Sequence, residues 1–338
     1  MRVFIHYSPK HYRDTFEGSR MRKNIKGACE LVGIEWLDFP SLPCDVAHFI
    51  SPADYPLLLQ KKEKGVPCLV SACYSENDPK ASFLEEGLHG RLFLTNKARR
   101  ILKAADMVTV PSEPLKKLLE GSGITTPIEV IEPMVNLTRF ADNAEEKEIF
   151  LRYFRVHPNT KTVISTGSYH DRATIQLIKQ IAALCPELEF YFFGSSSIID
   201  PFALMKSARS AKRTSNLHFC SLVQDDIYRS ALMSSLAYIS SGSTKPDAIA
   251  LLEAFASKTQ VVGLVGAKKN PLMLDQQTCY LFKGAEDLSA YLNSLSKGKA
   301  KQTIMAAFDV AKSHSLLNFG RELSSIYHRL TNQKGDIQ

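Results

Sequence analysis

The chain has 338 residues, of which 44% are hydrophobic and 23% charged, and its net charge is +7. This composition is typical of a globular protein with room for two domains, and no run approaches the about 20 apolar residues of a membrane span. Seven scattered cysteines without a C-x-x-C pair argue against a disulfide framework or a zinc site. The sequence starts directly with a strand-like segment and lacks a signal-peptide layout, so we expect a cytoplasmic protein with reduced thiols.

The first part of the chain alternates between strand and helix patterns. Short apolar runs predict strands at 3–6, 34–37, 46–50, 67–70, 107–110 and 128–131. Helical spacing of apolar residues predicts helices at 18–32, 55–64, 80–103 and 112–120. Strands that alternate with helices of this length indicate βαβ units and a parallel sheet.

A polar segment at 136–146 has no apolar periodicity and is predicted to be a linker. The alternation then restarts, with strands predicted at 162–165, 188–193, 217–220, 236–239 and 261–264. Helices are predicted at 172–184, from about Pro246, and throughout the chain after about residue 285. The pattern predicts two Rossmann-like α/β halves, with the ligand site between them at the carboxyl ends of strands.

Motifs of common cofactors are absent from the sequence. No G-x-G-x-x-G follows the first strand, and no G-x-x-x-x-G-K-[ST] or H-E-x-x-H occurs. We therefore expect no nicotinamide cofactor, no P-loop and no metal ion. The mild basicity allows an anionic partner, but no nucleic-acid-reading motif accompanies it, so nucleic acid is not an expected partner.

The segment from 238 to 257 is the most informative for chemistry. A predicted strand ends at Ile239, a loop with Gly242, Ser243 and Thr244 follows, and a helix starts near Pro246. Free amides and hydroxyls at a helix N-terminus form an anion site, and Glu253 further along could accept hydrogen bonds from both ribose hydroxyls. A capped polar turn without a ligand is the alternative.

A second segment, 164–172, has the same layout. Its strand leads through Gly167 into a helix that starts at Arg172, whose guanidinium could bind a diphosphate. The alternative is a solvated arginine in the first helical turn. The next predicted strand also ends at a glycine, Gly194.

Several segments in order resemble the retaining GT-B glycosyltransferases of family 4, in particular small bacterial diacylglycerol glycolipid glycosyltransferases. The matching stretches are Gly18-Ser-Arg20 with Gly33-Ile34, Cys44 to Ile50, Ala105 to Ser112, Glu148 to Phe154, and Leu252 to Ser257. The resemblance implies two Rossmann-like, doubly wound domains that face a cleft. The implied domains are an acceptor-side domain at 1–140, to which a helix at about 315–332 returns, and a nucleotide-sugar-binding domain at 141–314.

The chain departs from the family pattern at positions that normally contact the donor. Lys245 replaces the first glutamate of the E-x7-E motif, and Ala173 replaces a lysine after the glycine-rich loop. Ser71-Ala-Cys73 stands where the family has His-Gly-His. Lys245 could itself bind phosphate, and Asp247 could contact a sugar hydroxyl. These departures leave open a second function, that of a catalytically degenerate partner or regulator of an active glycosyltransferase.

The resemblance implies a metal-independent hexosyltransferase that moves a hexose from a UDP-sugar to a membrane glycolipid or cell-envelope acceptor. The residues that it assigns to the site form three groups: Lys245 and Asp247 as catalytic; Gly167, Arg172, Gly194, Gly242, Ser243, Thr244 and Glu253 on the donor side; and Gly18, Ser19, Arg20 and Cys73 on the acceptor side.

The segment 80–103 carries six basic and two acidic residues among its apolar ones. In the resembling enzymes a basic amphipathic segment of this region lies on the bilayer, which would place the protein on the inner face of the cell membrane. The alternative is an amphipathic helix that covers the sheet and leaves its basic side chains in solvent.

Overall fold

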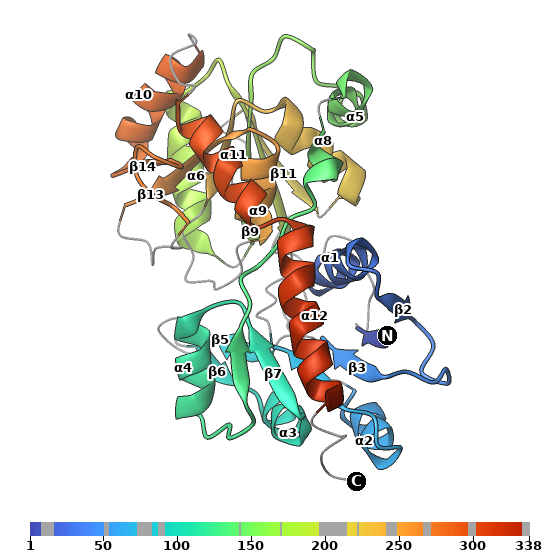
Figure 1. The fold of residues 1–338 in the computed structure, drawn as a ribbon. Helices are drawn as coiled ribbons and strands as arrows, with labels where there is room; N and C mark the ends of the chain where they lie inside the picture. Colours follow the sequence, from blue (N-terminus) through green and yellow to red (C-terminus); the bar gives the residue numbers. More distant parts are fainter. Residues whose placement is uncertain are drawn as a thin grey trace. The chain divides into compact units, whose positions relative to one another are not determined.

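A computed structural model describes residues 1–7, 17–50, 54–72, 83–86, 92–141, 143–169, 171–195, 215–221, 223–240, 249–265, 272–296 and 302–332. The chain divides into two compact units (Figure 1). Unit 1 consists of Met1–Asn136 together with His314–Gln338, and unit 2 consists of Leu137–Ser313.

Unit 1 is built on a six-stranded sheet whose order is β2-β1-β3-β4-β7-β8. Its strands are β1 Arg2–His6, β2 Glu35–Leu37, β3 Val46–Phe49, β4 Cys68–Ser71, β7 Met107–Val110 and β8 Ile128–Val130. All neighbours in this sheet pair in parallel. The interior strands β3, β4 and β7 are buried along their whole length, as parallel strands are when helices cover both faces.

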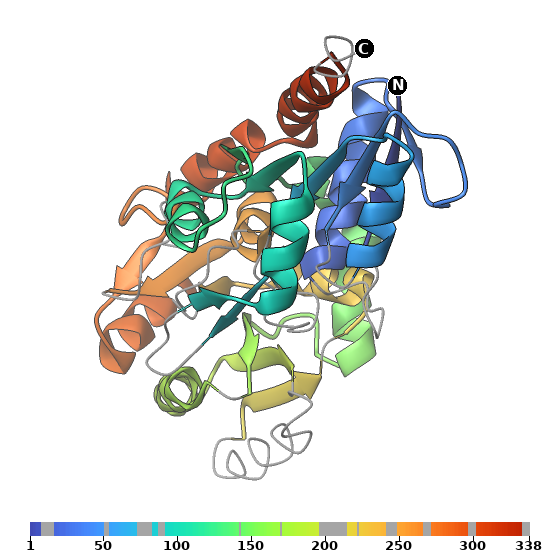
Figure 2. The same ribbon diagram turned by 90° about the horizontal axis from the view of Figure 1, so that it is seen from below.

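Five described helices belong to unit 1: α1 Glu17–Leu31, α2 Tyr55–Glu63, α3 Asn96–Ala104, α4 Glu113–Gly121 and α12 Leu316–Asn332. The last of these, in dark red in Figure 2, packs beside α1 although the two are far apart in sequence. A Cβ on Gly320 would lie 2.7 Å from the Ala28 carbonyl oxygen, so glycine is what permits this close approach.

Unit 2 has a second six-stranded parallel sheet, in the order β11-β10-β9-β12-β13-β14. Its strands are β9 Thr162–Ser168, β10 Glu189–Ser195, β11 Leu217–Ser221, β12 Ala237–Ser240, β13 Gln260–Leu264 and β14 Tyr280–Phe282. Its described helices are η2 Leu137–Phe140, α5 Ala144–Phe154, α6 Arg172–Leu184, α8 Asp225–Ser234, α9 Ile249–Ala256, α10 Ala285–Ser296 and α11 Gln302–Ser313.

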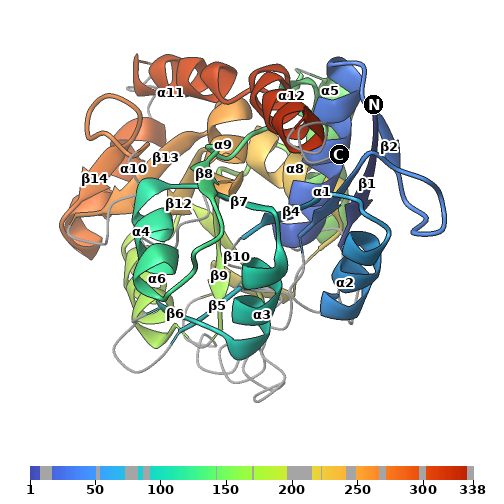
Figure 3. The ribbon, with the colours of Figure 1, turned by 60° about the horizontal axis from the view of Figure 1, so that its bottom comes forward.

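Side chains along β10 point alternately to the two faces of the sheet, and each face is covered by helices of unit 2. Phe190 and Phe192 belong to the core cluster that α6 and α10 complete on one face. Tyr191 and Phe193 point the other way, where Tyr191 meets the ring of Phe150 on α5 at a centroid distance of 5.0 Å. Figure 3 shows α6 and α10 on one side of the strands and α8 and α9 on the other.

The predicted strands are present, and the α/β class with two doubly wound parallel sheets is confirmed. The single helix predicted at 80–103 is wrong. Its described part forms an antiparallel pair, β5 Leu84–Glu86 and β6 Leu92–Leu94, followed by α3. Thr95 separates the two structures because its side chain accepts a hydrogen bond from the Ala98 amide and so starts a new helix.

The boundary between the two units falls within the segment 136–146, as expected of a linker, and the segment also contains η2 and the start of α5, which Asn143 caps. One further expectation about the chain's course needs correction. The chain after residue 285 is not continuously helical, because Ser315 forms a parallel β-bridge with Val135 between α11 and α12. None of the helices in the described residues has the length and apolarity that a membrane crossing requires.

Candidate functional site at the carboxyl ends of the unit 2 strands

The sheet of unit 2 has a topological switch point at β9. The chain runs from β9 to β10 on one side and later returns to β12 on the other side. In such sheets, ligands bind outside the carboxyl ends of the two strands where the order reverses. The segments singled out by sequence include the carboxyl ends of these two strands, β9 and β12, which pair with each other in the sheet.

Side-chain hydrogen bonds hold the ends of β9 and β12 together. The Ser165 hydroxyl donates to the Ile239 carbonyl at 3.0 Å, and the Thr166 and Tyr238 hydroxyls lie 2.7 Å apart. Ser165 and Thr166 lie in the middle of β9, and Tyr238 and Ile239 lie in the middle of β12. These bonds fasten the two strands to each other near their carboxyl ends.

Gly167 and Gly194 stand opposite each other in the β9–β10 register. A Cβ on Gly194 would lie 2.6 Å from Cε2 of Tyr169, so a larger residue would have to displace that ring. The Tyr169 hydroxyl donates to the carbonyls of Phe192 and Cys220, which anchors the ring over the ends of β10 and β11. Burial raises the pKa of Tyr169 well above its usual value, so this hydroxyl stays protonated. Sequence reasoning missed Tyr169.

The N-terminus of α6 carries both signs of charge. Asp171 caps the helix, and its carboxylate accepts from the Thr174 amide at 3.0 Å and the Thr174 hydroxyl at 2.6 Å. Arg172 is the first helical residue and its side chain is exposed. The exposed guanidinium of Arg172 would attract an anion to this end of α6. The Asp171 carboxylate, which already binds part of the helix terminus, would repel it.

Glu253 lies on α9, which follows β12, and its side chain is only 3% exposed. Nη1 of Arg139, from η2, lies 4.0 Å from its Oε1. Arg139 was not among the residues expected from sequence. The loop residues Gly242, Ser243, Thr244, Lys245 and Asp247 lie outside the described residues, as does Cys73 of the acceptor side.

In unit 1 the candidate residues Gly18, Ser19 and Arg20 form the first turn of α1, and all three are buried. This helix follows β1, which lies at the switch point of its sheet between β2 and β3. A Cβ on Gly18 would lie 2.5 Å from the Tyr7 ring, so glycine fits here. The Ser19 hydroxyl is buried without a hydrogen-bond partner among the residues that the structure describes.

Two other expectations concern metals and the basic segment. Within the described ranges no group of three or more His, Cys, Asp or Glu side chains could hold a metal ion. In the basic segment, α3 has no acidic residue, and its Lys97, Arg100 and Lys103 are exposed while Ile101 and Leu102 are buried. The helical part of the segment thus covers the core with one face and presents cations on the other.

No family model matches the sequence. A curated relative, the processive diacylglycerol alpha-glucosyltransferase of Acholeplasma laidlawii, is 24% identical over 238 residues, which are 70% of each chain. Among solved structures, a glycosyltransferase from Rickettsia africae matches with a TM-score of 0.68 and 16% identity over 97% of this chain and 98% of that one.

HepE of Anabaena, solved in complex with UDP and glucose, matches with a TM-score of 0.70 and 11% identity over 97% of this chain and 99% of that one. The sucrose-phosphate synthase of Thermosynechococcus elongatus matches with a TM-score of 0.71, also at 11% identity, over 98% of this chain and 99% of that one. At these identities the likeness establishes a shared fold that spans both units.

Proposed function

We propose that this chain, which has the GT-B glycosyltransferase fold and resembles the family 4 enzymes, transfers a hexose from a UDP-sugar to a membrane glycolipid or cell-envelope acceptor. The observation that carries the proposal is the meeting of the β9 and β12 ends in unit 2, with Glu253 on the helix that follows β12. A relative that acts on diacylglycerol and a neighbour solved with UDP and glucose support it.

Each candidate residue has a role in this proposal. Glu253 accepts hydrogen bonds from the ribose hydroxyls, and Arg172 binds the diphosphate. Gly167 lets the donor approach the end of β9 closely, and Gly194 leaves room for the Tyr169 ring at the end of β10. The donor-side group is completed by Gly242, Ser243 and Thr244 at the diphosphate and by Lys245 and Asp247 at the phosphate and sugar. On the acceptor side stand Gly18, Ser19, Arg20 and Cys73.

The proposed reaction retains the anomeric configuration and needs no metal. The bond between the anomeric carbon and the diphosphate oxygen breaks, and a bond to the acceptor hydroxyl oxygen forms on the same face of the sugar. The departing UDP takes up the hydroxyl proton. The protein contributes positioning and stabilises the negative charge that develops on the diphosphate.

Calorimetric titration with UDP, UDP-glucose and UDP-galactose, with GDP as the control nucleotide, tests the donor site. We expect saturable binding that is selective for uridine nucleotides and is lost in Glu253→Gln. Glu187→Gln, at an exposed carboxylate elsewhere in unit 2, should bind like the unchanged protein. Absence of binding at millimolar nucleotide would overturn the proposal.

A second candidate function, a degenerate partner of an active glycosyltransferase, is favoured by two observations. Lys245 and Ala173 replace donor-contacting residues of the family pattern. Asp171 also places a carboxylate on the helix terminus next to Arg172. The titration separates the two functions, because a degenerate partner binds no nucleotide but should still be co-purified with an active transferase.

We further propose that the exposed cations of α3 hold the protein on an anionic membrane surface, where a lipid acceptor would lie. Sedimentation with vesicles of anionic lipid should fall sharply in the triple variant Lys97→Glu, Arg100→Glu and Lys103→Glu. A matched variant, with glutamate at the exposed Lys64, Lys117 and Lys283, changes the net charge equally and should sediment normally. Equal loss in both variants would attribute binding to overall charge.

A further inference from the structure

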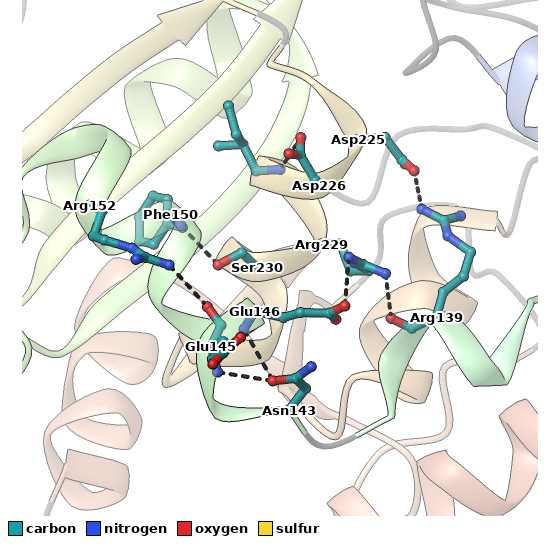
Figure 4. Close-up of polar contacts among 11 residues, drawn as sticks. Arg139, Asn143, Glu145, Glu146, Phe150, Arg152, Asp225, Asp226, Arg229 and Ser230 are labelled. Atoms are coloured by element: carbon teal, nitrogen blue, oxygen red, sulfur yellow. Dashed lines mark hydrogen bonds and ion pairs between the residues drawn. The ribbon is translucent and has the colours of Figure 1, made fainter.

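A network of charged side chains links η2, α5 and α8 within unit 2 (Figure 4). From η2 it extends to Glu253 on α9. The Arg139 guanidinium pairs with the Asp225 carboxylate through Nη2 and lies 4.0 Å from the Glu253 carboxylate through Nη1. Arg229 bonds the backbone carbonyl of Arg139 at 3.1 Å and pairs with Glu146 at 3.3 Å. The network thus contacts Glu253, the carboxylate that is proposed to bind the ribose, from the side of η2 and α8.

Burial gives this contact its importance. The Glu253 side chain is 3% exposed, and a buried carboxylate retains its charge only where cations or hydrogen-bond donors offset the loss of water. Arg139 is itself only 20% exposed, so solvent screens its attraction to Glu253 less than at the surface. The guanidinium therefore favours the ionised Glu253, the form that can accept two hydroxyl hydrogen bonds.

The position of Arg139 is fixed from two directions. The Asp225 carboxylate, in the first turn of α8, holds one end of the guanidinium, and Arg229, one turn further along, holds the backbone of η2. The planar guanidinium can serve Asp225 and Glu253 at once because its donors form a rigid fork. Lysine in the same place would offer a single point of charge.

We propose that Arg139 is a positioning residue for the donor nucleotide: it holds the Glu253 carboxylate ionised and in place for the ribose hydroxyls without touching the nucleotide itself. The inference rests on the proposed function, because it takes Glu253 as the ribose contact. It adds the prediction that Arg139 affects the affinity for the nucleotide only through the two ribose hydroxyls.

The test compares UDP with 2′,3′-dideoxy-UDP, which lacks both ribose hydroxyls, by calorimetry on the full chain. We expect Arg139→Ala to weaken UDP binding by about tenfold and dideoxy-UDP binding by less than about twofold, since the second ligand makes no contact with Glu253. Arg139→Lys should lie between Arg139→Ala and the unchanged protein, and it also serves if the alanine variant does not fold. Arg152→Ala, at an arginine of α5 that bonds a backbone carbonyl, should leave both affinities unchanged.

The outcomes separate this inference from the proposed function. If the unchanged protein prefers UDP and Arg139→Ala weakens both ligands equally, Arg139 has only a structural role and the inference is overturned. If the unchanged protein binds both ligands equally, or neither, the assignment of Glu253 fails and the inference fails with it.

Discussion

The Tyr327 hydroxyl of α12 lies 2.7 Å from Nδ1 of His48 on β3, and both side chains are completely buried in unit 1. The other ring nitrogen of His48 lies 2.6 Å from the Ser71 hydroxyl on β4, which in turn lies 2.7 Å from the Thr109 hydroxyl on β7. One chain of hydrogen bonds thus connects the last helix with three strands of the sheet. It uses up the polar groups that these strands would otherwise bury without partners.

Tyr327→Phe should lower the free energy of unfolding of unit 1 by about 1–3 kcal/mol, because it leaves Nδ1 of His48 buried without its partner. Trp36, the single tryptophan of the chain, lies on β2 of the same unit, so its fluorescence during urea unfolding reports on this unit. Ser41→Ala, which removes an exposed hydroxyl of the same unit, is the control and should change little. Equal midpoints for the two variants would contradict the prediction.

The same network makes unit 1 sensitive to acid. Burial lowers the pKa of His48 to about 3, whereas an unfolded histidine titrates near 6.5. Between these values the unfolded chain binds the extra proton, so the stability that neutral His48 contributes is complete above about pH 6.5. It is lost as the pH falls toward 3, at up to about 1.4 kcal/mol per pH unit. His48→Gln should flatten this part of the stability profile, and an unchanged slope in the variant would exclude His48 as its source.

The fold was largely predictable from the sequence because its signals are local. The strand at 107–110 and the helix at 172–184 stand where the apolar pattern predicts them. The pattern failed at 84–86 and 92–94, since short strands with mixed polarity resemble turns of an amphipathic helix. The strand β14 was also missed, because its three residues are too few to produce a periodic signal.

The candidate site was predictable only in part, for a similar reason. Gly167 lies near the end of β9 and Arg172 starts the next helix, so their position at a strand end could be inferred from neighbouring residues. Arg139 and Asp225 are 86 residues apart, and no sequence signal connects them. Tyr169 stands two residues after Gly167, but its hydrogen bonds go to β10 and β11, which only the folded sheet places beside it.

Gly320→Ala should destabilise unit 1 by about 1–3 kcal/mol, because the new methyl group would overlap the Ala28 carbonyl oxygen and push α12 away from α1. Gly121→Ala is the matched control. It lies in the last turn of α4 with no atom within 4 Å of the added Cβ, so it should be neutral or slightly stabilising. Urea unfolding followed by Trp36 fluorescence measures both, and a neutral Gly320→Ala would mean that α12 shifts without cost.

Asn216→Ala should destabilise unit 2 by about 2–3 kcal/mol. The buried amide of Asn216 donates to the carbonyls of Ala182, Cys185 and Leu188 at 3.0, 2.9 and 2.8 Å, which fastens the end of α6 to the start of β10. Asn216→Asp should cost more, since it turns a carboxylate toward these carbonyl oxygens. Hydrogen exchange of the α6 and β10 amides, compared with an Asn159→Ala control at an exposed position, measures the effect. Unchanged protection of these amides in Asn216→Ala and Asn216→Asp would contradict the prediction.

Asp171→Asn tests whether the N-terminus of α6 receives the diphosphate of the proposed donor. Asparagine caps helices as well as aspartate does, so the hydrogen bond to the Thr174 amide should persist and stability should change little. Removal of the negative charge beside Arg172 should raise the affinity for UDP by about two- to fivefold, and the gain should shrink at high salt. Uridine, which has no phosphate, should bind with unchanged affinity. An equal gain for uridine and UDP would mean that the substitution acts on the loop conformation and that the phosphates do not lie at this helix.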